Sequence, residues 1–270
     1  MKADRIVVLM GKELREFRSS PAAIAPVILL VVVCTVLPFV VVIGIPRMTG
    51  QSITSDRVLQ HVVSLARGRV PGLGRLPPDA AAQAFLFQQF LLLFLVAPIF
   101  GAVSLAAYSV VGEKQGGTLE PLLTSPMSTS EILLAKVLAS FLPSLAIELA
   151  GVCIYVLLVG ATALPGVTAT LVSVRSVILL GLVGPFASLT ALQMTIAVSS
   201  RVNDARSAQQ IAVLIVLPLV LMLIGQIAGA FIVTTPLLLL LALALAVTWI
   251  FLIWLSAALF ERETILTRWK

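Results

Sequence analysis

The residue types that carry chemistry are scarce in this sequence of 270 residues, and their spacing assembles no familiar active site. His61 is the one histidine, and it stands without Cys, Asp or Glu partners at ligand spacing. Cys34 and Cys153 lie in separate apolar stretches, so no disulfide framework is predicted. No G-x-x-x-x-G-K-[ST] loop occurs to hold nucleotide phosphates. We therefore predict no catalytic, cofactor-binding or metal-binding residue in this chain.

Glu148 is the only clear carboxylate within an apolar stretch long enough to cross a membrane. An intramembrane Ser-His protease needs a histidine in such a stretch, and an aspartic protease needs two Asp residues there, and neither condition is met. Carriers driven by protons or sodium ions use intramembrane carboxylates, so an ion-coupled secondary transporter using Glu148 stays open as the alternative. The inverted repeats of many such carriers are not evident between residues 1–130 and 131–270.

Three glutamines fall near the depth of Glu148 in the membrane. At about 1.5 Å of rise per residue, Glu148 lies roughly 25 Å along its helix from Glu131. Gln88 and Gln89 lie near the outer start of the second apolar stretch, and Gln226 lies near the outer end of the fifth. Because a lone carboxylate is unfavourable against lipid, Glu148 should point into the bundle or a water-filled cavity and find hydrogen-bond donors there, for which these glutamines are the natural candidates. Two interpretations stay open, a polar layer closing a translocation path and a structural hydrogen-bond cluster.

The elements that must position these side chains are membrane helices, because the composition is not that of a soluble protein. Hydrophobic residues make up 60% of the chain and charged residues 11%, whereas soluble domains are about 45–50% apolar and about 25% charged. The mean hydropathy is +1.13, and so much apolar surface has to face lipid. The net charge of +6 is spread along the chain, which argues against a nucleic-acid partner.

The apolar stretches predict an all-α integral membrane protein with six transmembrane helices in one domain, residues 1–270. Lys and Arg are more numerous in the segments that are inside when both termini are cytoplasmic, although five arginines lie in the first outer loop. We therefore expect both ends inside. Prolines inside the spans should kink several helices. The expected spans are residues 22–45, 83–111, 131–160, 174–199, 208–233 and 236–260, with an outer loop at 46–80, a cytoplasmic loop at 112–130 and a cytoplasmic tail at 261–270.

Residues 1–20 combine basic and apolar side chains at helical spacing, which predicts an amphipathic helix on the membrane surface. The cytoplasmic loop begins close to this helix, where Glu113 follows the second span. We expect Glu113 to form a salt bridge with Lys12, Arg15 or Arg18.

The segment from 112 to 136 carries the densest pattern of the sequence, reading GEKQGGTLEPLLTSPMSTSEILLAK. Thr118 can cap a short helix that ends before Pro126. Ser128 and Glu131 form a capping box for the third span. A plain connector needs neither two caps nor the apolar residues between them, so we predict a small amphipathic helix presented to the cytoplasm.

This loop resembles that of the type-2 ABC transporter permeases, in which a glutamate precedes GTLE, two leucines, a proline, and a later EI and Lys. Two further segments, SSRVNDARSAQQ at 199–210 and LFERETILTRW at 259–269, are similar to the same family. The resemblance therefore covers nearly the whole chain, and it is nearest to the sodium and drug exporter branch. The matching loop residues are Glu113, Gly117, Thr118, Leu119, Glu120, Leu122, Leu123, Pro126, Glu131, Ile132 and Lys136.

The resemblance implies that the chain is the permease subunit of an ATP-driven ABC exporter. It implies that residues 118–124 are a coupling helix that docks on a separate ATPase subunit, and that residues 1–20 are an elbow helix. The implied coupling residues are Glu113, Gly117, Thr118, Leu119, Glu120, Leu122 and Leu123.

ATP and Mg²⁺ would then be bound by the ATPase partner, because this chain has no nucleotide-binding motif. Six helices are half of the usual exporter core, which implies a homodimer with two ATPase subunits. The resemblance places the complex in the plasma (inner) membrane of a prokaryote. The apolar spans leave the transported substrate open.

Overall fold

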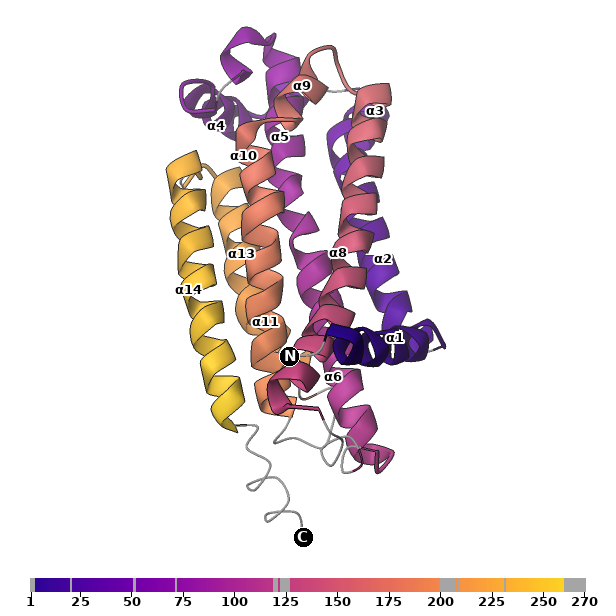
Figure 1. Ribbon diagram of the computed structural model, residues 1–270. Helices are drawn as coiled ribbons and strands as arrows, with labels where there is room; N and C mark the ends of the chain where they lie inside the picture. The colour runs from indigo at the N-terminus through magenta and orange to yellow at the C-terminus, as the bar shows by residue number, and fades with distance from the viewer. Residues whose placement is uncertain are drawn as a thin grey trace.

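Long helices running side by side make up the computed structural model of this protein (Figure 1). It describes residues 3–19, 21–50, 52–70, 72–118, 121, 127–199, 207, 209–230 and 232–259, and no strand occurs among them. The α-helices are α1 (Ala3–Ser19), α2 (Pro21–Phe39), α3 (Ile45–Thr49), α4 (Arg57–Arg67), α5 (Pro78–Phe94), α6 (Val96–Gln115), α8 (Thr129–Thr162), α9 (Val167–Leu171), α10 (Val174–Ile178), α11 (Gly184–Ser199), α13 (Ile211–Ile227) and α14 (Thr235–Leu259). Two π-helical turns, η1 (Val40–Gly44) and η4 (Leu179–Val183), and two 3₁₀ turns, η2 (Ile53–Ser55) and η3 (Leu73–Arg75), join them.

Five of the described helical segments are long and apolar enough to cross a membrane, and each overlaps a predicted span. The predicted span at 208–233 corresponds to α13, an apolar helix of 17 residues. Such a helix is about 25 Å long, slightly less than the hydrocarbon core of a bilayer. A sixth span therefore stays a prediction. The five segments are Ile24–Thr49, Pro78–Ser109, Ser130–Thr162, Val174–Ser199 and Thr235–Ser256.

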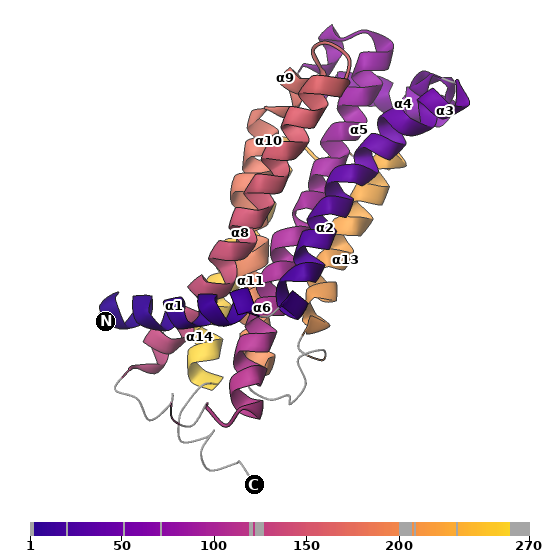
Figure 2. The same ribbon diagram turned by 90° about the vertical axis from the view of Figure 1, so that its right-hand side faces the viewer.

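The α5–α6 span lies at the centre of the bundle, where α2, α8, α11 and α13 pack against it, and α14 packs on α11 (Figures 1 and 2). In its most apolar window 83% of the residues are buried, whereas the other four spans have 17–50% buried. Many large apolar side chains of α2 and α14 are exposed, including Leu29, Leu240 and Ile250. In a membrane such surfaces face lipid or another protein.

Backbone irregularities in the spans lie just before prolines. The α5–α6 span breaks at Leu95, three residues before Pro98, and the η4 turn ends two residues before Pro185. A proline has no N–H to donate and its ring crowds the carbonyl four residues earlier, so the helix reorganises there. Regular α-helix is thus interrupted just before Pro98 and Pro185, and kinks at the predicted prolines stay a prediction. Pro26, Pro38, Pro143 and Pro218 lie inside continuous α-helices.

Two glycines let three spans approach closely at the α2, α6 and α8 contact. A Cβ atom on Gly151 of α8 would lie 2.5 Å from Cγ1 of Val31 on α2, and one on Gly101 of α6 would lie 2.8 Å from Oγ of Ser144 on α8. Small residues at such contacts are typical of membrane helices, because the backbones can then pack directly against one another.

The helix α1 lies across one end of the bundle, roughly perpendicular to the spans (Figure 2). Its buried side chains recur every four residues at Leu9, Glu13 and Phe17, which is the spacing of one helical face. Leu9 packs in a cluster with Ile132 of α8, and Phe17 packs in a second cluster. Residues 3–19 of the amphipathic helix predicted at 1–20 therefore form a helix, which packs on the bundle, and its place on the membrane surface stays a prediction.

The outer loop predicted at 46–80 contains α4, which lies at the other end of the bundle (Figure 1). Val62, Val63 and Ala66 form its buried face. Val62 contacts the turn between α13 and α14, where Gly229 has φ +76°, and a Cβ there would lie 2.6 Å from Val62 Cγ2. The loop is thus folded onto the helix ends rather than extended from them.

We expect Gly151→Ala to lower the thermal unfolding midpoint of the purified protein, because its methyl group would overlap Val31. Overpacking of this kind destabilises by about 1–3 kcal/mol. Gly181→Ala is the matched control, since no atom lies within 4 Å of the Cβ position there. Equal midpoints for the two variants would show that α2 and α8 are not in close contact at Gly151.

Candidate functional site

Lys136 is the centre of a buried charge network at the end of the bundle where α1 lies. Its Nζ atom is 2.9 Å from Oε1 of Glu13, 2.8 Å from Oε2 of Glu113 and 2.7 Å from Oγ of Ser109. The side chains of Lys136, Glu13 and Glu113 are only 2%, 1% and 4% exposed. One buried ammonium group therefore joins α1, α6 and α8.

A second, half-exposed cation completes the network. Nζ of Lys12 lies 3.0 Å from Oε1 of Glu113 and 3.3 Å from Oε1 of Glu16. Of the three partners predicted for Glu113, Lys12 is found, Arg15 is exposed, and the side chain of Arg18 lies outside the part of the chain that the structure describes. The sequence reasoning missed Lys136 as a partner. The available signal was that Lys136 lies five residues after Glu131 of the capping box, near the cytoplasmic start of the third span.

The local sequence fixes the position of each charged group. The capping box is confirmed, because Ser128 Oγ accepts from the Glu131 amide and Glu131 Oε2 accepts from the Ser128 amide, so α8 begins at Thr129. At the other end of the cytoplasmic loop, where α6 ends, Gly117 has φ +67° and the Thr118 amide donates to the Glu113 carbonyl. These are features of a helix C-terminus closed by a left-handed glycine. Glu113 and Lys136 therefore mark the two stems of the cytoplasmic loop.

The predicted coupling helix lies mostly outside the described residues, and so do Leu119, Glu120, Leu122 and Leu123. Thr118 was predicted to cap that helix. In the structure both its amide and its hydroxyl donate to the Glu113 carbonyl, which places Thr118 at the end of α6.

The network shifts the pKa values of its α1 residues. Burial alone would raise the pKa of Glu13, but the attraction of Lys136 and hydrogen bonds from Lys136 and Ser109 lower it below 4.5. Burial likewise opposes the charge of Lys12, and the hydrogen bond and attraction of Glu113 raise its pKa above 10.5. The stability contributed by Glu13 is thus present above pH 4.5 and lost as the pH falls through the folded-state pKa. The contribution of Lys12 is present below pH 10.5 and lost as the pH rises through its folded-state pKa.

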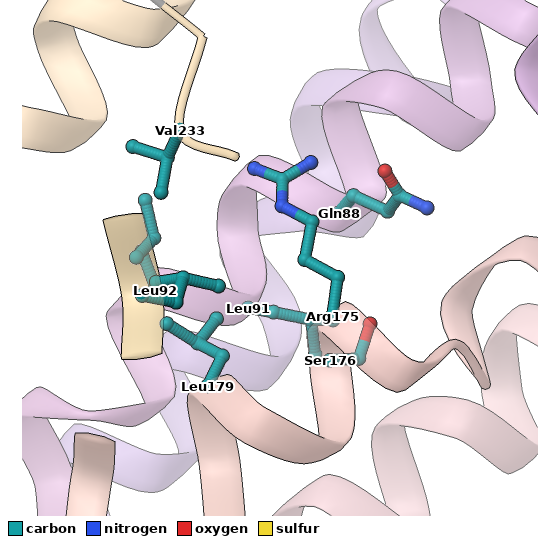
Figure 3. Close-up of a pocket in the computed structure, with 8 residues that line it drawn as sticks. Gln88, Leu91, Leu92, Arg175, Ser176, Leu179 and Val233 are labelled. Atoms are coloured by element: carbon teal, nitrogen blue, oxygen red, sulfur yellow. The ribbon is translucent and has the colours of Figure 1, made fainter. Parts of the chain in front are cut away.

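The predicted polar layer is divided between two places. Gln88 and Gln226 lie near Arg175 at the outer-loop end: Arg175 Nη2 donates to Gln226 Oε1 over 3.0 Å, and Gln88 and Arg175 line one small cavity (Figure 3). Gln88 Nε2 donates to the Thr170 carbonyl over 2.7 Å. Sequence reasoning treated Arg175 only as a topology charge. Its place at the start of a span, beside serines, was the signal available.

Glu148 is fully buried within the bundle, as predicted. A Cβ atom on Gly184, the residue that follows the η4 turn, would lie 3.4 Å from Oε1 of Glu148. The same Cβ position lies 3.8 Å from Cγ of Leu95, at the α5–α6 break. The predicted hydrogen bonds from the glutamines to Glu148 are absent among the described residues, and Gln89 is likewise buried with an unpartnered amide. The glutamines and Glu148 therefore do not form one hydrogen-bonded layer, because Gln88 and Gln226 bond with Thr170 and Arg175 instead.

Long apolar helices packed in this way define a multi-pass membrane protein. The family model of the ABC-2 family transporter proteins matches residues 7–244, and the chain therefore belongs to the ABC-2 type transporter permeases. It is a membrane permease subunit of an ABC transporter, and its family implies association with ABC ATPase subunits. Among curated proteins, none matches this chain.

We expect Lys136→Met to destabilise the protein strongly, because it would leave the buried carboxylates of Glu13 and Glu113 beside each other without the central cation. Removing one partner of a buried ion pair lowers the free energy of unfolding by about 3–5 kcal/mol. Lys12→Met is the control, since an ion pair of a half-exposed side chain contributes about 0–1 kcal/mol. The measurement is the unfolding free energy in detergent micelles. Similar losses in the two variants would contradict the central role of Lys136.

Proposed function

We propose that this chain is the permease subunit of an ATP-driven exporter, that it forms the translocation path as a dimer, and that separate ATPase subunits bind ATP and Mg²⁺. The observation that carries the proposal is the buried network of Lys136, Glu13 and Glu113. It holds both stems of the loop that resembles a coupling loop, and it fastens them to α1.

The network gives a physical route for coupling. The ATPase subunit pushes on the loop when it closes on ATP, and the loop passes the movement to its stems. Because Lys136 Nζ and Glu113 Oε2 are 2.8 Å apart, α6 and α8 move as one unit. The bond from Lys136 to Glu13 carries α1 with them. Separate movement of any of the three helices would leave a charge buried without its partner, which is strongly unfavourable.

We assign α1 as the elbow helix. It lies across the bundle end, and Val7 and Val8, which are 58% and 74% exposed, give it an apolar surface outside its contact with α8. A helix of this kind is suited to the boundary between lipid headgroups and acyl chains. The α1 end then faces the cytoplasm.

We count α13 as the sixth span. It is apolar throughout, and it runs along the bundle beside α5, α6 and α11 between the two ends (Figures 1 and 2). With six crossings both termini are cytoplasmic, in the plasma membrane of a prokaryote, and the loop pattern favours the sodium and drug exporter branch. The ion-coupled carrier is the weaker candidate, because membership of the ABC-2 family supplies an ATPase partner instead.

We predict that replacing Leu122 and Leu123 together with Asp prevents binding of the ATPase subunit, because a short docking helix depends on a few buried apolar anchors. Membrane insertion should be unchanged, since the loop lies outside the spans. Ser130→Asp, at an exposed position of the same segment, is the control for added negative charge. The measurement is co-purification of the ATPase subunit and ATP hydrolysis by the complex. ATP hydrolysis by the purified chain alone, or an unaltered complex with the double variant, would contradict the proposal.

We predict that Glu148→Gln keeps both assembly and transport, because the carboxylate accepts no hydrogen bond among the described residues and the amide has nearly the same shape. Transport assays on the assembled complex in vesicles test this expectation. Transport lost with the complex intact would instead place Glu148 on the translocation path, in contact with substrate or cation.

A further inference from the structure

The end of the bundle where α4 lies carries an excess of positive charge. Residues 46–80 contain five arginines and two aspartates, with no lysine or glutamate. Both aspartates have local partners. Asp56 accepts from the Val58 amide over 2.8 Å. Asp79 accepts from the Thr54 hydroxyl over 2.6 Å. Among the described residues, no ion pair joins an arginine of this loop to a carboxylate. A concentration of one sign of charge attracts small ions of the other sign.

Arg67 at the end of α4 is fixed in position but has no counter-charge. Its Nη2 atom donates to the Leu76 carbonyl over 3.0 Å. Its Nε atom is buried without a hydrogen-bond partner among the described residues. Its Nη1 atom also makes no hydrogen bond there, but this atom is accessible rather than buried. A guanidinium group that is already oriented, with one nitrogen still open, is well suited to pair with a carboxylate.

Arg67 lines a cavity of about 230 Å³ between α4, the η2 turn and the start of α5 (Figure 1). Gln60 and Ser64 give its wall polar surface, and both are exposed, so the cavity opens to solvent. Leu59 and Val63 give it apolar surface. Pockets for drug-sized ligands enclose about 300–1,000 Å³. This cavity is therefore suited to a smaller molecule that combines an anionic group with a short apolar part.

Side-chain contacts hold the walls of this cavity in place. The Gln60 side-chain amide donates to the Thr54 carbonyl, and the Thr54 hydroxyl donates to Asp79, so that α4, the η2 turn and α5 are joined. The helix α4 also packs through Val62 against the turn at Gly229. Because the site is already formed, a ligand loses little affinity to the ordering of its walls.

The charge on the cavity wall indicates the class of anion. Arg67 is the one charged residue among those that line the cavity. A carboxylate carries a single negative charge, which one guanidinium group balances, and its two oxygens can accept from two nitrogens. A phosphate monoester carries about −1.5 to −2 charges at pH 7 and would leave charge without a partner in a half-buried site. The cavity therefore favours a carboxylate.

We propose that this cavity binds a small amphipathic carboxylate, with its carboxylate group on Arg67 and its apolar part against Leu59 and Val63. A short alkyl carboxylate such as hexanoate has this chemistry. The site requires only the folded outer loop, and it does not depend on the direction of transport or on the proposed coupling route.

The test measures binding of hexanoate to the whole chain in phosphatidylcholine nanodiscs by ligand-observed NMR titration, with empty nanodiscs as the blank. We expect hexanamide, which has no charge, and acetate, which has no long alkyl part, to bind about tenfold more weakly or worse. We expect Arg67→Gln to reduce the affinity for hexanoate about tenfold through loss of the charged donor. Arg69→Gln is the matched control, because it removes the same charge from an exposed position outside the cavity wall, and it should bind hexanoate as the wild-type protein does.

Ser64→Phe tests the cavity independently of the charge. The aromatic ring would occupy space at the cavity wall while the hydrogen bond from Arg67 to the Leu76 carbonyl remains, so hexanoate binding should be lost. Unchanged binding in Ser64→Phe, equal binding of hexanoate and hexanamide by the wild-type protein, or equal losses in Arg67→Gln and Arg69→Gln would overturn the proposal. Acetate binding as tight as that of hexanoate would also overturn it, since the apolar wall would then play no part. If Arg67→Gln does not fold, Ser64→Phe and the comparison of the three ligands on the wild-type protein decide the question.

Discussion

The ion pairs of Lys136 with Glu13 and Glu113 are the interaction on which the α1 end of this protein depends. Removing three charges from water is strongly unfavourable, so the network persists only while all three groups meet in good geometry. Its members belong to three different helices, and their mutual requirement fixes those helices relative to one another. An apolar contact could slide by a fraction of a helical turn, whereas these distances of 2.8–2.9 Å allow little displacement.

In the rest of the bundle, by contrast, the steric fit between helices decides which spans are neighbours. Lipid tails are as apolar as the side chains of the spans, so burial in a membrane gives little preference for one helix neighbour over another. Close contacts at Gly101 and Gly151 supply that preference for α2, α6 and α8. The described spans depart from regular α-helix at η1, near Leu95 and at η4. Glu148 is buried beside Gly184, the residue that follows η4.

The two ends of the bundle differ in the partners of their charged side chains. At the α1 end Lys136, Glu13 and Glu113 each have an opposite charge at hydrogen-bonding distance. At the α4 end Arg175 has only a neutral glutamine, and buried amide atoms around it lack partners among the described residues. The α1 end is therefore held together by opposite charges on three helices, whereas the α4 end has a charge whose side-chain partner among the described residues is neutral.

The sequence by itself determined that the chain lies in a lipid bilayer, that its fold is all-helical, and where the helices on either side of the cytoplasmic loop end and begin. Hydropathy and length set the spans, because about 20 apolar residues are needed to cross a bilayer, and the Ser128–Glu131 capping box set the start of α8 since both partners are local. Family membership also followed from the short pattern around Glu113. Only the tertiary structure decided which buried polar groups meet. Helix rotation and depth are set by packing between segments far apart in sequence, so Lys136 as the partner of Glu13, Gln226 as the partner of Arg175, and the separation of Glu148 from the glutamines could not be derived from spacing along the chain.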